Sequence, residues 1–329
     1  MSIEERIHAA TDIPYGMKQL FTSVTYLKED EKVLVITDDN TKDIGEYVYK
    51  HAKRFFDTTM ICMSPRDGHG EEPPASVKVA MLECDVIFGA TTMSMYHTRA
   101  RVDGTDKKIF RWVGMQDYAF HMFEEGGLTA DFDEVTEVID RVEEYYQGKT
   151  FRLTAPGGTD MTCSIEGRAP VLDYGTSRYP GSASLPPNSE IALGPVEGTA
   201  NGVLVFDGSI PHPLINLLDE PVTCKVEDGY ITKITGGKEA KILIDILKAY
   251  DDPSVYNIAE LGLGLNKHNE LCGRMAPDEG SFGNIHIGIG KNLNFGGEVD
   301  SPLHMDLLIK TVTIDIDGRK IMKDGKLQV

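Results

Sequence analysis

In the first half of the chain, short apolar runs alternate with stretches whose apolar residues recur at helical spacing. The runs predict buried strands at residues 31–39, 59–63, 85–90 and 108–113. The stretches predict helices at residues 14–27, 74–83 and 131–147, the last with Asp131 at its N-cap, and a further helix through Ile44, Val48 and Ala52. Strands and helices in this alternation predict an α/β domain, a parallel sheet with crossover helices.

After about residue 148 the pattern changes to short alternating strands separated by proline and glycine. Residues 149–154 and 160–165 are two such strands, and Asp228-Gly229 stands at the turn of a predicted hairpin. A single helix is expected at residues 238–250. Because 329 residues exceed the usual size of one core, we expect two domains, 1–148 and 149–329, the second mostly antiparallel α+β.

Composition and charge narrow the classes of function. The formal charge of −19 disfavours nucleic acid, whose phosphates need clustered Lys and Arg. The five cysteines lack CxxC spacing and suit a reducing compartment. No apolar run approaches eighteen residues, and the N-terminus does not read as a secretory leader. We expect a cytoplasmic protein that neither crosses a membrane nor binds nucleic acid.

Several familiar catalytic motifs are missing from the sequence. The turn after the first strand, residues 37–42, holds no glycine, which disfavours a dinucleotide site. The sequence contains neither HExxH nor GxSxG. A thermolysin-like zinc helix is therefore excluded, and a serine nucleophile has no supporting motif.

Lone titratable residues interrupt apolar, glycine-rich runs near the C-terminus. Glu260 lies in the run NIAELGLG, and His286 lies in the run NIHIGIG. In SPLHMD, His304 and Asp306 are two residues apart, so on a strand over residues 304–316 both point to one face. Burying such groups is costly unless they are paired or bind a metal. These residue types suit zinc, manganese, cobalt or iron.

A fifth candidate precedes this cluster in the sequence. Glu190 follows the double proline of LPPNSE, and Glu197 competes with it for the same role. Two imidazoles and three carboxylates exceed the ligands of a closed four-coordinate zinc site. Two divalent ions sharing a bridging carboxylate are therefore a reasonable inference.

In these motifs the second half resembles the aminopeptidase T family of metallopeptidases. The resemblance makes Glu190, Glu260, His286, His304 and Asp306 the ligands of a dinuclear site, and it implies a two-domain homodimer. The sequence departs from the family at KNLNF, residues 291–295, where the family has a tyrosine. Glu279, in PDEGS, is our candidate for the general base.

The chain also resembles 2,5-dihydroxypyridine 5,6-dioxygenase, most closely around YITKITGG and DPSVY. That resemblance implies one ferrous ion held by two histidines and one carboxylate. His304 and Asp306 match two of these ligands. The other histidine falls where this chain has Glu260, and the dioxygenase has no counterpart of His286.

Because the ligand set sides with the peptidases, we expect a metal-dependent hydrolase. The expected activity is that of an aminopeptidase with two zinc, cobalt or manganese ions, acting on a short peptide or other small molecule. The alternatives are a mononuclear non-heme Fe(II) ring-cleaving dioxygenase and a metal-binding relative without catalytic activity.

Overall fold

The computed structural model describes residues 1–116 and 118–329. Packing divides the chain into two compact units: Met1–Asp133 with Tyr174–Pro187, and Glu134–Asp173 with Asn188–Val329. The chain thus passes between the units more than once. The boundary at residues 148 and 149, expected from sequence texture, stays a prediction.

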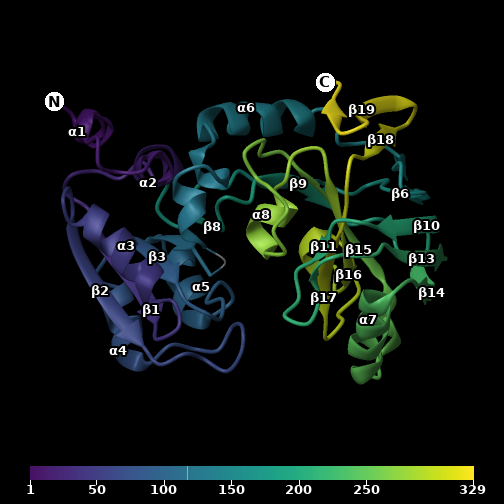
Figure 1. Ribbon diagram of the computed structural model, residues 1–329, viewed down its shortest axis with the longest axis horizontal. Coiled ribbons are helices and arrows are strands. Elements are labelled where there is room, and N and C mark those ends of the chain that lie inside the picture. The colour runs from purple at the N-terminus through teal and green to yellow at the C-terminus, as the bar shows by residue number, and fades with distance from the viewer. Residues whose placement is uncertain (117) are drawn as a thin grey trace. The chain divides into compact units, whose positions relative to one another are not determined.

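A parallel sheet forms the centre of the first unit, with strand order β2-β1-β3-β4-β8 (Figure 1). The strands are β1 Lys32–Asp38, β2 Asp57–Met63, β3 Val86–Ala90, β4 Arg111–Gly114 and β8 Ala183–Ser184. The first four agree with the predicted runs. A strand of two residues such as β8 is too short to leave a periodic pattern.

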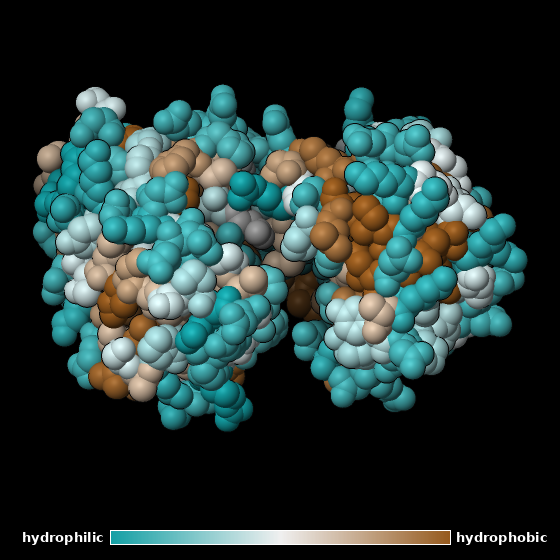
Figure 2. All heavy atoms as spheres, turned by 60° about the horizontal axis from the view of Figure 1, so that its bottom comes forward, coloured by the Kyte–Doolittle hydropathy of each residue, from teal (hydrophilic) through white to brown (hydrophobic). Residues whose placement is uncertain are grey.

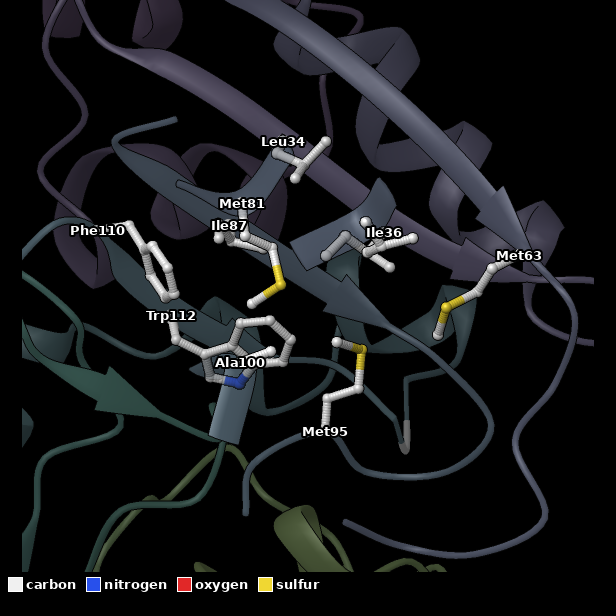
Figure 3. Packing of buried hydrophobic residues seen from close by; sticks show 10 residues of the cluster. Leu34, Ile36, Met63, Met81, Ile87, Met95, Ala100, Phe110 and Trp112 are labelled. Carbon is white, nitrogen blue, oxygen red and sulfur yellow. The ribbon is translucent and has the colours of Figure 1, made fainter. Parts of the chain in front are cut away.

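Helices cover both faces of this sheet. On one face, Phe21 packs against Phe88 with ring centroids 6.2 Å apart, and Gly45 lies close to Thr37. On the other face, Leu34, Ile36, Ile87 and Trp112 pack with Met81 and Ala100 (Figure 3). The helices are α1 Ile3–Ala9, α2 Tyr15–Gln19, the π-helix η1 Leu20–Val24, α3 Lys42–Ala52, α4 Ala75–Met81, α5 Arg99–Asp106, and the 3-10 helices η2 Phe120–Phe123 and η3 Gly127–Thr129.

Two larger antiparallel sheets make up most of the second unit. The first has the order β14-β13-β10-β6-β5-β18-β19-β20, and the second, which we call the site sheet, has the order β17-β16-β15-β9-β7. The first consists of β5 Thr150–Thr154, β6 Asp160–Ser164, β10 Asn201–Phe206, β13 Val222–Glu227, β14 Tyr230–Thr235, β18 Thr313–Ile316, β19 Arg319–Lys323 and β20 Lys326–Leu327. The site sheet consists of β7 Val171–Asp173, β9 Glu190–Leu193, β15 Ile258–Gly264, β16 Ile285–Gly290 and β17 His304–Ile309.

Short elements complete the fold. β11 Ser209–Ile210 pairs with β12 Asn216–Leu217. The remaining helices are α6 Phe132–Glu143, α7 Lys238–Ala249, α8 Met275–Glu279, and the 3-10 helices η4 Pro253–Tyr256 and η5 Leu293–Phe295. The predicted fold class is confirmed: a parallel α/β sheet with helices, and a mostly antiparallel second region.

One predicted element is wrong in its extent. Residues 304–316 do not form a single strand, because the chain turns at Thr311, whose φ is +57°. β17 therefore belongs to the site sheet, and β18 pairs with β5 in the other sheet. The expected alternation within β17 is unaffected, so His304 and Asp306 still share a face.

Hydrophilic side chains cover most of the face shown in Figure 2, with hydrophobic groups gathered in smaller areas. This agrees with a chain in which 26% of residues are charged. Across the described residues, none of the helices is long and apolar enough to span a bilayer.

Candidate metal centre

The two faces of the site sheet differ in composition because successive residues of a strand alternate between faces. Every residue of β15 and β16 is buried. One face is apolar and includes Leu261, Leu263, Ile285, Ile287 and Ile289. The opposite face carries all five predicted ligands, which β9, β15, β16 and β17 bring together.

Strand register places a glycine opposite each of these five residues. The cross-strand pairs are Glu190–Gly264, Glu260–Gly288, His286–Gly262, His304–Gly290 and Asp306–Gly288. Side chains in directly opposite positions normally lie within contact of each other. Glycine removes that neighbour on one side of each polar group, which leaves bare backbone there.

The space above two of these glycines, Gly262 and Gly288, is filled by the candidate ligands themselves. A Cβ atom added to Gly262 would lie 2.0 Å from Nε2 of His286. On Gly288 it would lie 2.7 Å from Cβ of Glu260 and 2.8 Å from Cε1 of His304. Gly262 in ELGLG and Gly288 in HIGIG are therefore part of the site. The alternate glycines beside Glu260 and His286 are visible in the sequence, but the sequence alone does not show that they make room for these side chains.

The donor atoms form two groups that share Glu260. In the first, Nε2 of His286 lies 3.3 Å from Oε2 of Glu190 and 3.2 Å from Oε1 of Glu260. In the second, Nε2 of His304 lies 3.0 Å from Oε2 of Glu260 and 3.5 Å from Oδ1 of Asp306. Within each group, one donor atom per residue lies within 4.8 Å of the others.

His304 is held from behind by the segment that precedes β17. Its Nδ1 lies 2.7 Å from the Lys291 carbonyl oxygen, and the Phe295 ring stacks on the imidazole at 5.6 Å. The contact with a carbonyl makes Nδ1 the donor and leaves Nε2 to face the carboxylates. The buried Nδ1 of His286, by contrast, has no such partner among the described residues.

Burial and opposite charges act against each other in this cluster. Burial favours the neutral imidazole, yet the Glu190 and Glu260 carboxylates raise the pKa of His286 to about 10. The carboxylates of Asp306 and Glu260 likewise hold the pKa of His304 well above its usual range despite burial. Burial raises the pKa of Glu190 to about 8. For Asp306 the His304 imidazole outweighs burial and lowers the pKa to about 2.

Glu279, the candidate base, is at the end of α8 and its carboxyl group hydrogen-bonds to Asp306. Burial raises the pKa of Glu279 well above its usual range, and the nearby carboxylate of Asp306 adds to this. The preceding Asp278 anchors α8 by accepting hydrogen bonds from Ser209 and from the Cys272 and Gly273 amides. Glu279 therefore contacts the cluster, and its assignment as general base stays a prediction.

These groups fit a bound cation. Oε2 of Glu190 and Oδ1 of Asp306 are buried acceptors that receive no hydrogen bond among the described residues, although the imidazoles of His286 and His304 lie 3.3 and 3.5 Å from them. Buried acceptors usually have a partner, and a divalent cation would supply one. Imidazole and carboxylate donors accept several first-row metals.

Glu197 is not part of the cluster. Its Oε1 accepts hydrogen bonds from Nδ2 of Asn292, 2.8 Å away, and from the Glu298 amide, 2.9 Å away. Its other carboxylate oxygen contacts Arg168. Of the two glutamates that compete for this role in the sequence, Glu190 therefore lies against His286, whereas Glu197 hydrogen-bonds to Asn292 and Glu298.

An α/β and antiparallel fold with imidazoles and carboxylates, buried or half-buried except for the more exposed His304, on one sheet face is typical of a metal-dependent enzyme. The family model for 2,5-dihydroxypyridine 5,6-dioxygenase matches residues 18–329. The chain therefore belongs to the 2,5-dihydroxypyridine 5,6-dioxygenase family, and membership implies an enzyme that uses a metal.

Individual relatives agree with this assignment. The 2,5-dihydroxypyridine 5,6-dioxygenase of Pseudomonas putida KT2440 is 30% identical over 189 residues, which is 54% of each protein. The match thus spans about half the length of that relative. The solved 2,5-dihydroxypyridine dioxygenase from P. putida KT2440 has a TM-score of 0.77 at 20% identity, covering 96% of both chains.

A peptidase shares the fold. AmpT from Thermus thermophilus has a TM-score of 0.69 at 14% identity, covering 96% of this chain and 98% of its own. Identity this low establishes common architecture and nothing about activity.

The expected aminopeptidase-like hydrolase is therefore wrong, because the family match and the P. putida relative both identify a dioxygenase. The metal remains implied, but no finding supports the expected pair of zinc, cobalt or manganese ions. The ligand set does not distinguish the two activities, because imidazole and carboxylate donors serve both chemistries.

Proposed function

We propose that this protein is a ring-cleaving dioxygenase that uses one ferrous ion and acts on a hydroxylated pyridine. The observation that carries the proposal is the family match over residues 18–329. Support within the structure comes from Glu260, His304 and Asp306, whose donor atoms converge on the glycine-lined face of the site sheet. The expected substrate is a small molecule such as 2,5-dihydroxypyridine.

Glu260, His304 and Asp306 would hold the ion. When bound, ferrous iron supplies the one-electron chemistry with O2 that protein side chains lack. The Lys291 carbonyl orients His304, and Glu279 hydrogen-bonds to Asp306. Glu260 stands where the resemblance places a histidine, so this site would hold iron with one imidazole and two carboxylates.

His286 and Glu190 would support Glu260 from the other side. Nε2 of His286 contacts the oxygen of Glu260 that faces away from His304. A carboxylate fixed at one oxygen presents the other in a defined direction. We therefore assign His286 and Glu190 to orientation of Glu260. A homodimer and a cytoplasmic location stay predictions.

The test is turnover by iron-loaded protein. The purified chain is loaded with Fe(II) without oxygen, mixed with 2,5-dihydroxypyridine, and exposed to O2. We expect one O2 consumed per substrate lost, with a product that gains the mass of one O2 because both atoms enter and one ring bond breaks. Protein loaded with Zn(II), which has no redox chemistry, is the matched control.

The proposal fails if protein that retains iron consumes no O2 with any of a panel of hydroxypyridines. Tight iron binding without turnover would favour a metal-binding relative that lacks catalysis.

A further inference from the structure

The segment between β16 and β17, residues 291–303, is folded around one buried side chain. Asn292 is fully buried, although its neighbours at 291 and 293–300 are half-buried or exposed. Its amide donates to the Val299 carbonyl at 3.1 Å, and its side-chain oxygen accepts from the Val299 amide at 2.8 Å. Its own carbonyl accepts from the amides of Phe295 and Gly297. One residue thus closes the loop by four hydrogen bonds.

A glutamate from a distant part of the sequence fixes this loop to the rest of the unit. Oε1 of Glu197 accepts from Nδ2 of Asn292 and from the Glu298 amide, at 2.8 and 2.9 Å. Arg168 contacts the other oxygen of Glu197. We call Glu197 and Asn292 the loop clamp. Hydrogen bonds to a charged acceptor are among the stronger ones in proteins.

Packing at the loop clamp leaves little freedom. A Cβ atom on Gly297 would lie 2.0 Å from Nδ2 of Asn292. The carboxamide therefore rests directly on the Gly297 backbone. The amide of Asn292 cannot turn away without breaking its contacts with both Glu197 and Val299.

The same loop carries the two groups that orient His304. Lys291, next to Asn292, supplies the carbonyl that accepts from Nδ1 of His304. Phe295, whose amide donates to the Asn292 carbonyl at 2.9 Å, stacks on the imidazole with planes 23° apart. The His304 side chain is 31% exposed, so its orientation depends strongly on the Lys291 carbonyl and the Phe295 ring.

We propose that Glu197 and Asn292 are positioning residues for metal binding, acting through the Lys291 carbonyl and the Phe295 ring on His304. The inference rests on the proposed function only in that His304 is a metal ligand. Outer partners of ligating histidines typically change metal affinity by about 10- to 100-fold. A similar loss is expected when the loop clamp is removed.

Two variants disrupt the contact between the Asn292 carboxamide and the Gly297 backbone, one from each partner. Asn292→Ala removes the carboxamide, and Gly297→Ala places a methyl group where it lies. Asn294→Ala, a substitution of the same type at an exposed position of the same loop, is the matched control. Co(II) is titrated into each metal-free protein, and both affinity and the visible absorption spectrum are recorded.

We expect Asn292→Ala and Gly297→Ala to bind Co(II) about 10- to 100-fold more weakly, with altered spectra, and Asn294→Ala to match the wild type. Glu197→Gln keeps one oxygen that can accept from Asn292 but loses the charge that pairs with Arg168, so its loss of affinity should be smaller than that of Glu197→Ala. A purely structural role would lower unfolding temperature without changing the spectrum.

Wild-type affinity and spectrum in both Asn292→Ala and Gly297→Ala would overturn the inference. If one of these two variants does not fold, the Co(II) affinity and spectrum of the other variant and of Glu197→Ala test the inference instead. Co(II) binding without oxygenase activity in the wild type would leave the loop clamp standing while the proposed function failed. Absence of Co(II) binding by the wild type would overturn both.

Discussion

Strands β3 and β16 are both buried along their whole length, yet their glycines serve different purposes. In β3, a Cβ on Gly89 would lie 2.3 Å from the ring of Trp112, so this glycine admits an apolar ring. In β16, Gly288 admits Glu260 and His304. One glycine allows dense packing of a core, and the other allows polar donors to meet.

The difference explains what an apolar run with glycine can and cannot indicate. β3 reads VIFGA; the face of Ile87 packs in the cluster of Figure 3, and Phe88 on the other face packs against Phe21. β16 reads IHIGIG, in which only the isoleucines face a core. A titratable residue followed by alternate glycines, as in β16, indicates a strand with one apolar face and one face that carries functional side chains.

The largest effect expected is on metal binding in Asp306→Ala. Removing a ligand should weaken Fe(II) binding by more than about 100-fold, beyond what outer partners cost. Iron per chain after desalting measures this directly. Asp245→Ala, which removes an exposed carboxylate from α7, is the control and should keep wild-type iron.

The same variant should also change stability without metal. Asp306→Ala should unfold at a lower denaturant concentration than the wild type, because it removes the carboxylate that pairs with the His304 imidazole. Wild-type iron content in Asp306→Ala would exclude the residue from the site.

Much of the fold could be read from the sequence because its strands are strongly patterned. The residues within each of the four strands of the parallel sheet, and the Asp228-Gly229 pair itself, are enough to predict these elements. Asp228 and Gly229 indeed have φ of +48° and +82°, as a two-residue hairpin turn requires. The turn at Thr311 could not be predicted, since neither glycine nor proline marks it.

The candidate ligands could be found, but their chemistry could not. A lone Glu260 or His286 in an apolar run is costly to bury, and that cost is visible in the sequence. Which reaction follows depends on the metal and on substrate contacts, and carboxylates and imidazoles accept iron as readily as zinc. Similarity along the whole chain decided between dioxygenase and hydrolase.

A second, smaller effect tests the two glycines against each other. Gly288→Ala should weaken Fe(II) binding by about 10-fold, as for a disturbed outer partner, because the added methyl group meets Glu260 and His304. Gly89→Ala should leave metal affinity unchanged and lower the free energy of unfolding by about 1–3 kcal/mol through overpacking.

Both proteins are measured by Fe(II) titration and by urea unfolding with a chelator present. If Gly89→Ala weakened metal binding as much as Gly288→Ala, the contrast between the two strands would be lost. The loss would mean that overpacking anywhere in the chain reaches the site.

The smallest effect is expected where the two regions should behave alike. Ile87 in β3 and Ile287 in β16 are both fully buried on apolar faces. Ile→Val at either position removes one methylene and should cost about 0.5–1.5 kcal/mol of unfolding free energy.

Ile287 stands between His286 and Gly288 in sequence but points to the other face of the sheet, so Fe(II) affinity should not change. In the double variant the two costs should add to within about 0.5 kcal/mol, because the sites share no partners. Weaker iron binding by Ile287→Val would show that the apolar face determines the position of the donors, and the separation of packing from chemistry in the site sheet would have to be abandoned.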